Sequence, residues 1–304
     1  MPYLIKENIK LHYTDSKLTH PNIKTKATII TTHGMSESHL YWSITGITDS
    51  LIKAGYRVIN TDMRGHGFTE VNQEDKGYDV YSLAQDILDL ADYLNIETFH
   101  LLTHATGGIV GFHLAFEHSN RLLSIMATNT GSATFPSNEF AKITDPDAVI
   151  PPLSEKDAQG NIGLAKTFKG KSKGDLMQAA RQYASKSPFL CNMPNLEHAE
   201  TAFAQYAACS YIADPDNIAD FVESFYTSYD PHIKELRTIQ CPTLILVGEF
   251  DHLFIEAAKL IAREIPNCEH VTMKGIGHMT AFEAPSELTE ILVSFLTKNE
   301  TKAA

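Results

Sequence analysis

Short apolar runs and amphipathic stretches alternate along most of the chain. The run 27–33 is rich in β-branched residues and stops at Gly34, which is typical of a buried strand. Behind Ser82 and Gln85, which have the spacing of a capping box, apolar residues recur at helical spacing. The same pattern predicts further strands over 57–61, 99–103, 122–128, 242–247 and 270–273, and helices over 42–54, 106–117, 255–264 and 286–296.

Strands that alternate with helices of this length indicate βαβ units, and hence a parallel sheet covered on both faces. The rhythm breaks between residues 134 and 229, where helical stretches begin near Asp175, Asn195 and Asp214, and Pro215 suits a first helical position. A helical insert above the carboxyl ends of the strands would cap the crevice where such sheets bind ligands. We therefore expect one α/β core, residues 1–133 and 231–304, interrupted by a helical cap, residues 134–230.

Composition restricts the class of protein further. The 304 residues are 43% hydrophobic and 20% charged, which indicates a folded globular protein. With 25 Lys and Arg against 37 Asp and Glu, the formal charge is −12, which disfavours nucleic acid and anionic membranes as partners. The sequence contains no long apolar run and no basic leader, so we expect a cytoplasmic protein. We expect no cofactor and no metal, and we interpret the four dispersed cysteines as buried free thiols: Cys191, Cys209, Cys241 and Cys268.

The segment 101–109 joins a predicted strand to a predicted helix and carries the most informative motif. A sharp turn there needs small residues around its apex, because side chains would otherwise collide across the bend. The apex is Ala105, with His104 before it and Gly107 and Gly108 behind it. In the G-x-S-x-G turn of serine hydrolases, the apex is the nucleophilic serine.

Four further motifs occur in a fixed order, two before this turn and two after it. Together with the turn, they show that the chain resembles the α/β-hydrolase superfamily from about residue 32 to residue 283. The resemblance implies a mostly parallel, eight-stranded sheet flanked by helices, with a helical cap. It also implies that an acid and a histidine follow the apex in that order. The motifs are His33-Gly34, the loop Asp62-Met-Arg-Gly-His-Gly-Phe-Thr69, Gly248-Glu-Phe-Asp251, and Gly275-Ile-Gly-His278-Met279.

The resemblance also assigns roles to individual positions. With serine at position 105, the hydroxyl would attack an ester carbonyl, His278 would carry the proton, and Asp251 would orient the imidazole. The backbone N–H groups of Met35 and Thr106 would form the oxyanion hole. His33 and His66 are expected to organise loops through hydrogen bonds.

Ala105 has no hydroxyl and cannot form an acyl-enzyme. The chain is either a native binding protein of hydrolase fold or the product of an engineered Ser→Ala change. We favour the engineered change, because His278 and Asp251 are both present. The segment 128–131, where some relatives carry the acid, has no carboxylate, which strengthens the assignment of Asp251.

The expected cap is rich in large apolar side chains: Phe168, Met177, Tyr183, Phe189, Phe203, Tyr206, Tyr211, Phe221, Phe225 and Tyr226. Packing between cap helices accounts for most of them, but so many together also indicate a roomy hydrophobic pocket. We expect the substrate to contact Gly34, Met35, His104, Phe189, Tyr206, Phe225 and Met279.

The leading function is hydrolysis of a carboxylic ester or lactone of a bulky hydrophobic small molecule. Acyl-homoserine lactones, resorcylic lactones and the macrolactone rings of macrolide antibiotics all remain open. The negative charge weakly favours macrolides, which carry protonated amino sugars. Epoxide hydrolases and dehalogenases need a carboxylate at the apex, for which Ala105 is a less usual replacement. A non-catalytic small-molecule binder is the alternative, a peptidase is a third possibility, and the oligomeric state stays open.

Overall fold

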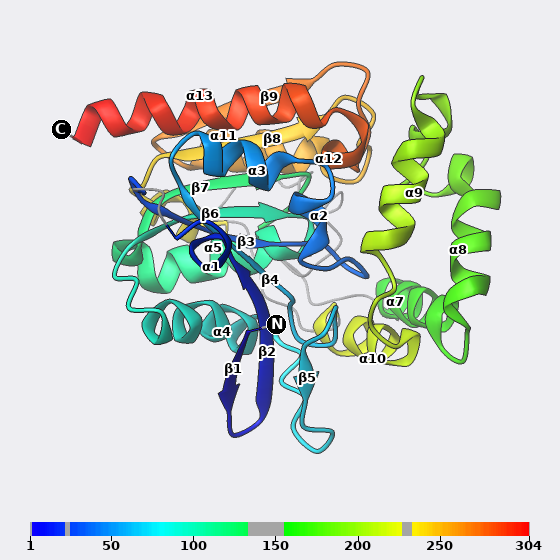
Figure 1. Cartoon of the computed structure of the whole chain (residues 1–304). Coiled ribbons are helices and arrows are strands. Elements are labelled where there is room, and N and C mark those ends of the chain that lie inside the picture. Colours follow the sequence, from blue (N-terminus) through cyan, green and yellow to red (C-terminus); the bar gives the residue numbers. More distant parts are fainter. Residues whose placement is uncertain (1, 22–24, 133–154, 227–232, 304) are drawn as a thin grey trace.

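The computed structural model describes residues 2–21, 25–132, 155–226 and 233–303 (Figure 1). Its nine-stranded sheet has one strand more than expected. Eight strands follow the order β1-β2-β4-β3-β6-β7-β8-β9, and the two-residue strand β5 pairs with β2 beside this path. From β4 to β9 every pairing is parallel, whereas β1, β2 and β5 pair antiparallel. The strands are β1 Tyr3–Lys6, β2 Ile9–Asp15, β3 Thr28–Thr32, β4 Arg57–Thr61, β5 Glu70–Val71, β6 Phe99–His104, β7 Leu122–Thr128, β8 Thr243–Gly248 and β9 Cys268–Met273.

Helices cover both faces of the sheet, and successive strand residues point into two separate hydrophobic cores. Leu101 of β6 packs in the core shared with α4, α5 and α11, while the next residue, Leu102, packs with α3 and α13 on the other face. Figure 1 shows α3 and α13 on one side of the sheet and α4 on the other. The helices of the core are α1 Ser16–Thr19, α2 Leu40–Ser43, α3 Ile47–Lys53, α4 Val80–Tyr93, α5 Thr106–His118, α11 Ile255–Glu264, α12 Thr280–Glu283 and α13 Pro285–Ala303.

Two predicted helix boundaries are wrong. The helix expected over 42–54 is divided into α2 and α3, because Gly46 adopts a left-handed φ of 84° between them. The capping box expected at Ser82 does not form, since α4 begins earlier and the Asp79 side chain accepts from the Ser82 N–H at 2.9 Å. Gly55 directly follows Ala54, the C-cap of α3, with a left-handed φ of 100°, which suits a glycine at this position.

The described part of the expected cap is helical, and the four helices α7–α10 gather beside one end of the core (Figure 1). The prediction for Asp214 and Pro215 is confirmed, because α10 begins at Pro215 and the Asp214 side chain accepts from the Asp216 N–H. The first part of the expected range, 134–154, lies outside the described residues. The cap helices are α7 Glu155–Phe168, α8 Lys173–Gln182, α9 Ala199–Cys209 and α10 Pro215–Phe225, and 3₁₀ turns span Ser119–Arg121, Ala184–Lys186, Met193–Asn195 and Glu235–Thr238.

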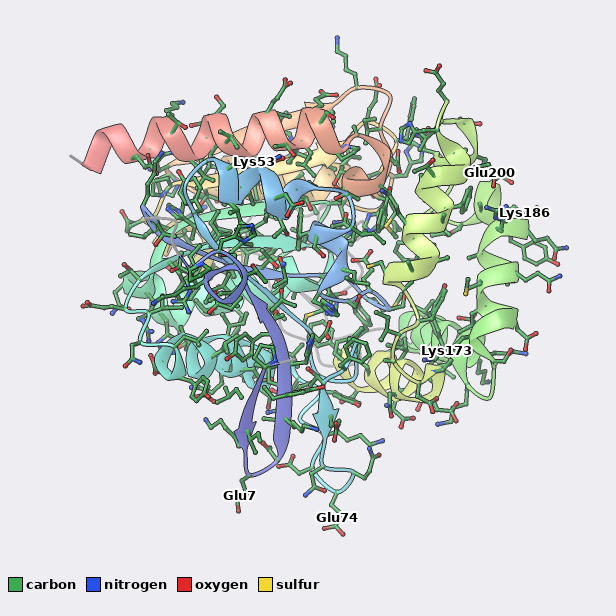
Figure 2. The ribbon with its side chains drawn as sticks, in the orientation of Figure 1. Glu7, Lys53, Glu74, Lys173, Lys186 and Glu200 are labelled. Carbon is green, nitrogen blue, oxygen red and sulfur yellow. The ribbon has the colours of Figure 1, made fainter. Side chains whose placement is uncertain are left out.

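Charged side chains such as Glu7, Glu74 and Glu200 extend away from the ribbon (Figure 2). All four cysteines are free, as expected, although only Cys209 and Cys241 are fully buried. None of the helices in the described ranges is both long enough and apolar enough to cross a membrane.

Candidate active site

Ala105 sits at the apex of the turn between β6 and α5. It adopts a φ of 46° and a ψ of −116°, a strained conformation that costs about 1–3 kcal/mol and is held by its surroundings. Its N–H donates to the Thr128 carbonyl at 3.0 Å, and its own carbonyl accepts from the Thr130 hydroxyl at 2.6 Å. The backbone at the apex is therefore fixed by hydrogen bonds to the end of β7, and strain of this kind is concentrated at active sites.

The two glycines after the apex are required by close packing. A Cβ on Gly107 would lie 2.4 Å from the Thr32 hydroxyl oxygen and 2.7 Å from the His33 carbonyl oxygen. A Cβ on Gly108 would lie 2.4 Å from the Thr130 hydroxyl oxygen. The structure thus confirms that this turn needs small residues, because α5 begins in direct contact with the ends of β3 and β7.

His278 and Asp251 form a buried pair. The His278 Nδ1–H donates to Asp251 Oδ2 at 2.8 Å, which leaves the Nε2 lone pair free to accept a proton. Both side chains are buried, and Asp251 also accepts from the N–H groups of Leu253 at 3.1 Å and Phe254 at 3.3 Å. Position 105 and His278 line the same cavity, so the apex and this imidazole face one space.

Asn129 is a member of this site that the sequence did not reveal. It follows β7 with a left-handed φ of 51°, and its side-chain amide donates to Asp251 Oδ2 at 2.8 Å and to the Gly277 carbonyl at 3.2 Å. The amide thereby ties Asp251 to the loop that carries His278. The only signal in the sequence is its place directly after a buried strand, in the segment 128–131 that lacks a carboxylate.

Met35 and Thr106 line the same cavity as the apex, and Thr106 directly follows it. A Cβ on Gly34 would lie 3.1 Å from the Ala105 Cβ, so the loop after β3 touches the apex. The Gly107 N–H donates to the His33 carbonyl at 3.1 Å and holds this loop against α5. Within the described ranges, neither the Met35 nor the Thr106 N–H donates to a backbone carbonyl.

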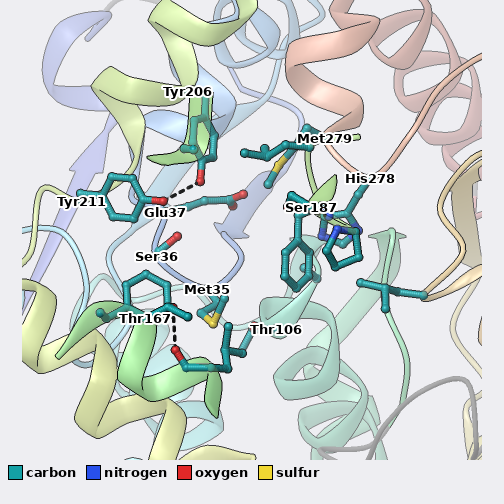
Figure 3. Close-up of a pocket in the computed structure, with 18 of the residues that line it drawn as sticks. Met35, Ser36, Glu37, Thr106, Thr167, Ser187, Tyr206, Tyr211, His278 and Met279 are labelled. Atoms are coloured by element: carbon teal, nitrogen blue, oxygen red, sulfur yellow. Dashed lines mark hydrogen bonds between the residues drawn. The ribbon is translucent and has the colours of Figure 1, made fainter. Parts of the chain in front are cut away.

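A cavity of about 490 Å³ opens between the core and the cap helices (Figure 3). Apolar side chains dominate its walls, and polar contributions come from groups that include Ser36, Glu37, the Thr106 hydroxyl and four tyrosines. The Tyr206 and Tyr211 hydroxyls are hydrogen-bonded to each other at 3.0 Å, and the Tyr226 hydroxyl is hydrogen-bonded to Thr106 Oγ1. Six of the ten large cap side chains line the cavity: Phe168, Tyr183, Phe189, Tyr206, Tyr211 and Tyr226.

Three of the residues expected to contact substrate lie behind the cavity wall in the described structure: Gly34, His104 and Phe225. Phe225 is fully buried and stacks on Phe221 at a centroid distance of 5.0 Å, so it belongs to the core rather than to the pocket. His104 is buried and stacks on Tyr41 at 4.3 Å. Met35, Phe189, Tyr206 and Met279 line the cavity as expected, and Phe189 meets the His278 ring at 5.2 Å.

The loop after β4 is held by buried histidines, as expected for His33 and His66. The His33 Nε2 accepts from the Met63 N–H at 3.1 Å, and the His66 Nδ1–H donates to the Arg64 carbonyl at 2.8 Å. Burial lowers the pKa of His33 to about 4 and that of His66 to about 3, so both rings are neutral. Uncharged rings that bond to the backbone are suited to organising a loop.

Glu37 is the second site residue that sequence reasoning missed. It is 2% exposed, it lines the cavity, and its Oε2 accepts from the Gly34 N–H at 2.7 Å. Burial raises the pKa of this carboxyl to about 8. Its position four residues after His33 carries no recognised motif, so only the folded structure brings it to the site.

Comparisons with known proteins agree with this geometry. Residues 27–285 match the family described as alpha/beta hydrolase fold. The chain is 24% identical over 247 residues to 3-oxoadipate enol-lactonase 1 of Acinetobacter baylyi, covering 81% of this chain and 80% of that protein. It is 23% identical over 306 residues to epoxide hydrolase A of Mycobacterium tuberculosis, covering 90% and 91% of the two proteins.

A solved thermophilic esterase from Thermogutta terrifontis has the same fold, with a TM-score of 0.72 and 21% identity over 96% of this chain and 94% of that one. The match to the family spans most of the sheet and every element that carries a candidate catalytic group. The chain therefore belongs to the alpha/beta hydrolase fold family.

Proposed function

We propose that this chain is the inactive Ala105 form of a serine hydrolase that cleaves a carboxylic ester or lactone of a bulky hydrophobic substrate. One observation carries the proposal: the hydrogen-bonded His278–Asp251 pair is buried, and its histidine shares a cavity with a strained apex at position 105. This is the arrangement that activates a serine hydroxyl at the apex.

With serine at position 105, the reaction takes two steps. The hydroxyl attacks the ester carbonyl while His278 Nε2 takes its proton, and Asp251 stabilises the imidazolium. The oxyanion is bound by the N–H groups of Met35 and Thr106, and its collapse expels the alcohol, which receives the proton from His278. Water, activated by the same histidine, then releases the acid and restores the hydroxyl.

The cavity supports a bulky hydrophobic substrate. A volume of about 490 Å³ with aromatic walls exceeds what an acetate ester would fill. A large lactone, such as a macrolactone of the macrolide type, and a smaller lactone both fit this description. The net charge of −12 favours substrates that carry a protonated amine, through long-range attraction.

A non-catalytic binding protein is the second candidate, and Ala105 itself favours it. If alanine is the native residue, the cavity binds the same class of hydrophobic molecule without cleaving it. The two candidates share a ligand and differ only in turnover, so one substitution separates them.

The test is the Ala105→Ser variant, assayed with chromogenic esters of increasing acyl length and with a panel of small and large lactones. We expect a burst followed by turnover, both abolished when His278→Ala is added. An Ala105→Asp variant assayed with epoxides is the matched control for a carboxylate nucleophile. If the Ala105→Ser variant is folded, binds panel members and never cleaves them, the binding protein is correct and the hydrolase is not.

A further inference from the structure

The N–H groups expected to bind the oxyanion belong to two segments, the loop that carries Met35 and the turn that carries Thr106. The carboxyl group of Glu37 lies between these segments. Glu37 Oε2 accepts from the Gly34 N–H, directly before Met35, while Glu37 Oε1 lies 3.6 Å from His104 Nε2, two residues before Thr106. Figure 3 shows Glu37 on the cavity wall beside Tyr206 and Tyr211. The side chain therefore contacts both halves of the site without belonging to the triad.

The hydrogen bonds of His104 fix which of its nitrogens carries the proton. The Thr128 hydroxyl donates to the Thr103 carbonyl at 3.1 Å, so its oxygen is an acceptor for the His104 Nδ1–H at 3.0 Å. His104 Nε2 is then an unprotonated lone pair, and it is buried without a hydrogen-bond partner in the described structure. The carboxyl oxygen that it faces is that of Glu37.

A carboxylate at this place would be poorly solvated. Its single backbone donor is the Gly34 N–H, and the lone pair of His104 Nε2 would repel a charged Oε1. A proton on Oε1 removes the charge and turns this repulsion into attraction. Burial acts in the same direction, because it raises the pKa of Glu37 to about 8 and lowers that of His104 well below its usual value.

His278 lies beyond His104, at a ring-centroid distance of 4.9 Å, and the other groups close to Glu37 supply no positive charge at neutral pH. They are Tyr41 of α2, His104 at the end of β6, Tyr206 and Cys209 of α9, Tyr211 behind α9, and Tyr226 behind α10. Burial raises the pKa of each tyrosine and of the thiol, so all of them are neutral. A neutral Glu37 keeps this side of the cavity uncharged where an oxyanion would form.

We propose that Glu37 is a positioning residue that works as a neutral carboxylic acid, bridging Gly34 of the oxyanion loop and His104 of the nucleophile turn. Glu37 orders the two N–H groups that receive the oxyanion, and it touches neither the scissile bond nor the triad. Its ionisation would place a buried negative charge beside the developing oxyanion and oppose the reaction. This inference rests on the proposed function for its kinetic consequences but not for the protonation state itself.

The kinetic test uses the Ala105→Ser background. Glutamine is isosteric with the neutral acid, because its carbonyl oxygen accepts from Gly34 and its amide donates toward His104. We expect Glu37→Ala to lower kcat at least tenfold with little change in KM, and Glu37→Gln to restore most of that loss. Above pH 8, kcat of the parent should fall, to less than a tenth of its maximum by pH 9.5, while Glu37→Gln should show no such fall.

Glu264→Gln is the matched control, because Glu264 lies outside the cavity and pairs with Arg237 and Arg263. This control should keep the alkaline fall of the parent. If Glu37→Gln is as impaired as Glu37→Ala, or if the alkaline fall persists in Glu37→Gln, the neutral-acid role is wrong.

A measurement on the Ala105 chain itself tests the protonation state independently of catalysis. The infrared carbonyl band of a protonated carboxylic acid should be present at pH 7, disappear above pH 9, and be absent at pH 7 from Glu37→Gln. If the band is present but the Ala105→Ser variant is inactive, the proposed function is wrong and the protonated state of Glu37 still holds. Absence of the band at pH 7 would overturn the assignment of Glu37.

Discussion

Two buried carboxyl groups serve the same site and are held in opposite ways. Asp251 accepts hydrogen bonds from four N–H donors, supplied by His278, Asn129, Leu253 and Phe254. Glu37 accepts from one, the Gly34 N–H, and its other oxygen faces a nitrogen lone pair. Both are at most 2% exposed, so burial does not distinguish them. The number of hydrogen-bond donors distinguishes the two carboxyl groups, since each donor replaces part of the lost hydration of a charged oxygen.

The largest expected effect comes from Asp251. In the Ala105→Ser background, Asp251→Asn should lower kcat about 10⁴-fold, because the imidazole loses the carboxylate that fixes its tautomer and stabilises its charge. Steady-state kinetics with a chromogenic ester measures this loss, and circular dichroism checks that the variant is folded. A loss smaller than tenfold in the folded variant would mean that Asp251 is not the triad acid.

The second effect is on stability and needs no substrate. The pKa of Glu37 is raised from 4.5 to about 8 on folding, so the unfolded chain loses this proton at a lower pH than the folded chain. Stability contributed by this group is therefore present below pH 4.5 and decreases as pH rises to 8, by up to about 5 kcal/mol. Urea unfolding at pH 5, 6.5 and 8 should show Glu37→Gln gaining stability relative to the parent along this range. A constant difference between the two proteins would contradict the raised pKa.

A smaller effect is expected at Asn129, which supplies one of the four donors of Asp251. Asn129→Leu should lower the free energy of unfolding by about 1–3 kcal/mol, because Asp251 Oδ2 and the Gly277 carbonyl lose a buried donor. In the Ala105→Ser background we also expect kcat to fall about tenfold, since the acid is less firmly placed. Asn299→Leu on α13 is the control. If both variants lose activity equally, the loss in Asn129→Leu does not come from the placement of Asp251, and this prediction is wrong.

Much of this site could be predicted because it follows local rules. The apex, the acid and the histidine each lie in the connection that follows a strand, with a glycine nearby in the sequence. The structure brings Ala105 and His278 to one cavity, with Asp251 behind the histidine. The alternation of apolar runs likewise predicted the parallel strands from β3 to β9. No prediction covered the hairpin β1–β2, whose short strands lie outside the βαβ rhythm.

What could not be predicted depends on where a side chain ends in space. Phe225 and Tyr226 are adjacent, yet only Tyr226 lines the cavity, because Phe225 points into the stack with Phe221. Asn129 and Glu37 acquire their roles from partners 122 and 67 positions away, Asp251 and His104. Such contacts follow from the packing of several elements, and no local pattern of polar and apolar residues specifies them.

Intact-mass analysis of the Ala105→Ser variant, mixed rapidly with a lactone substrate, tests the central claim most directly. A lactone keeps its leaving alcohol, so the account predicts a transient mass increase equal to the mass of the intact lactone, located by peptide mapping at position 105. Addition of water then releases this group as the hydroxy acid. If the folded variant binds lactones and esters yet gains no mass and releases no acid, position 105 is not a nucleophile site, and the hydrolytic account is wrong.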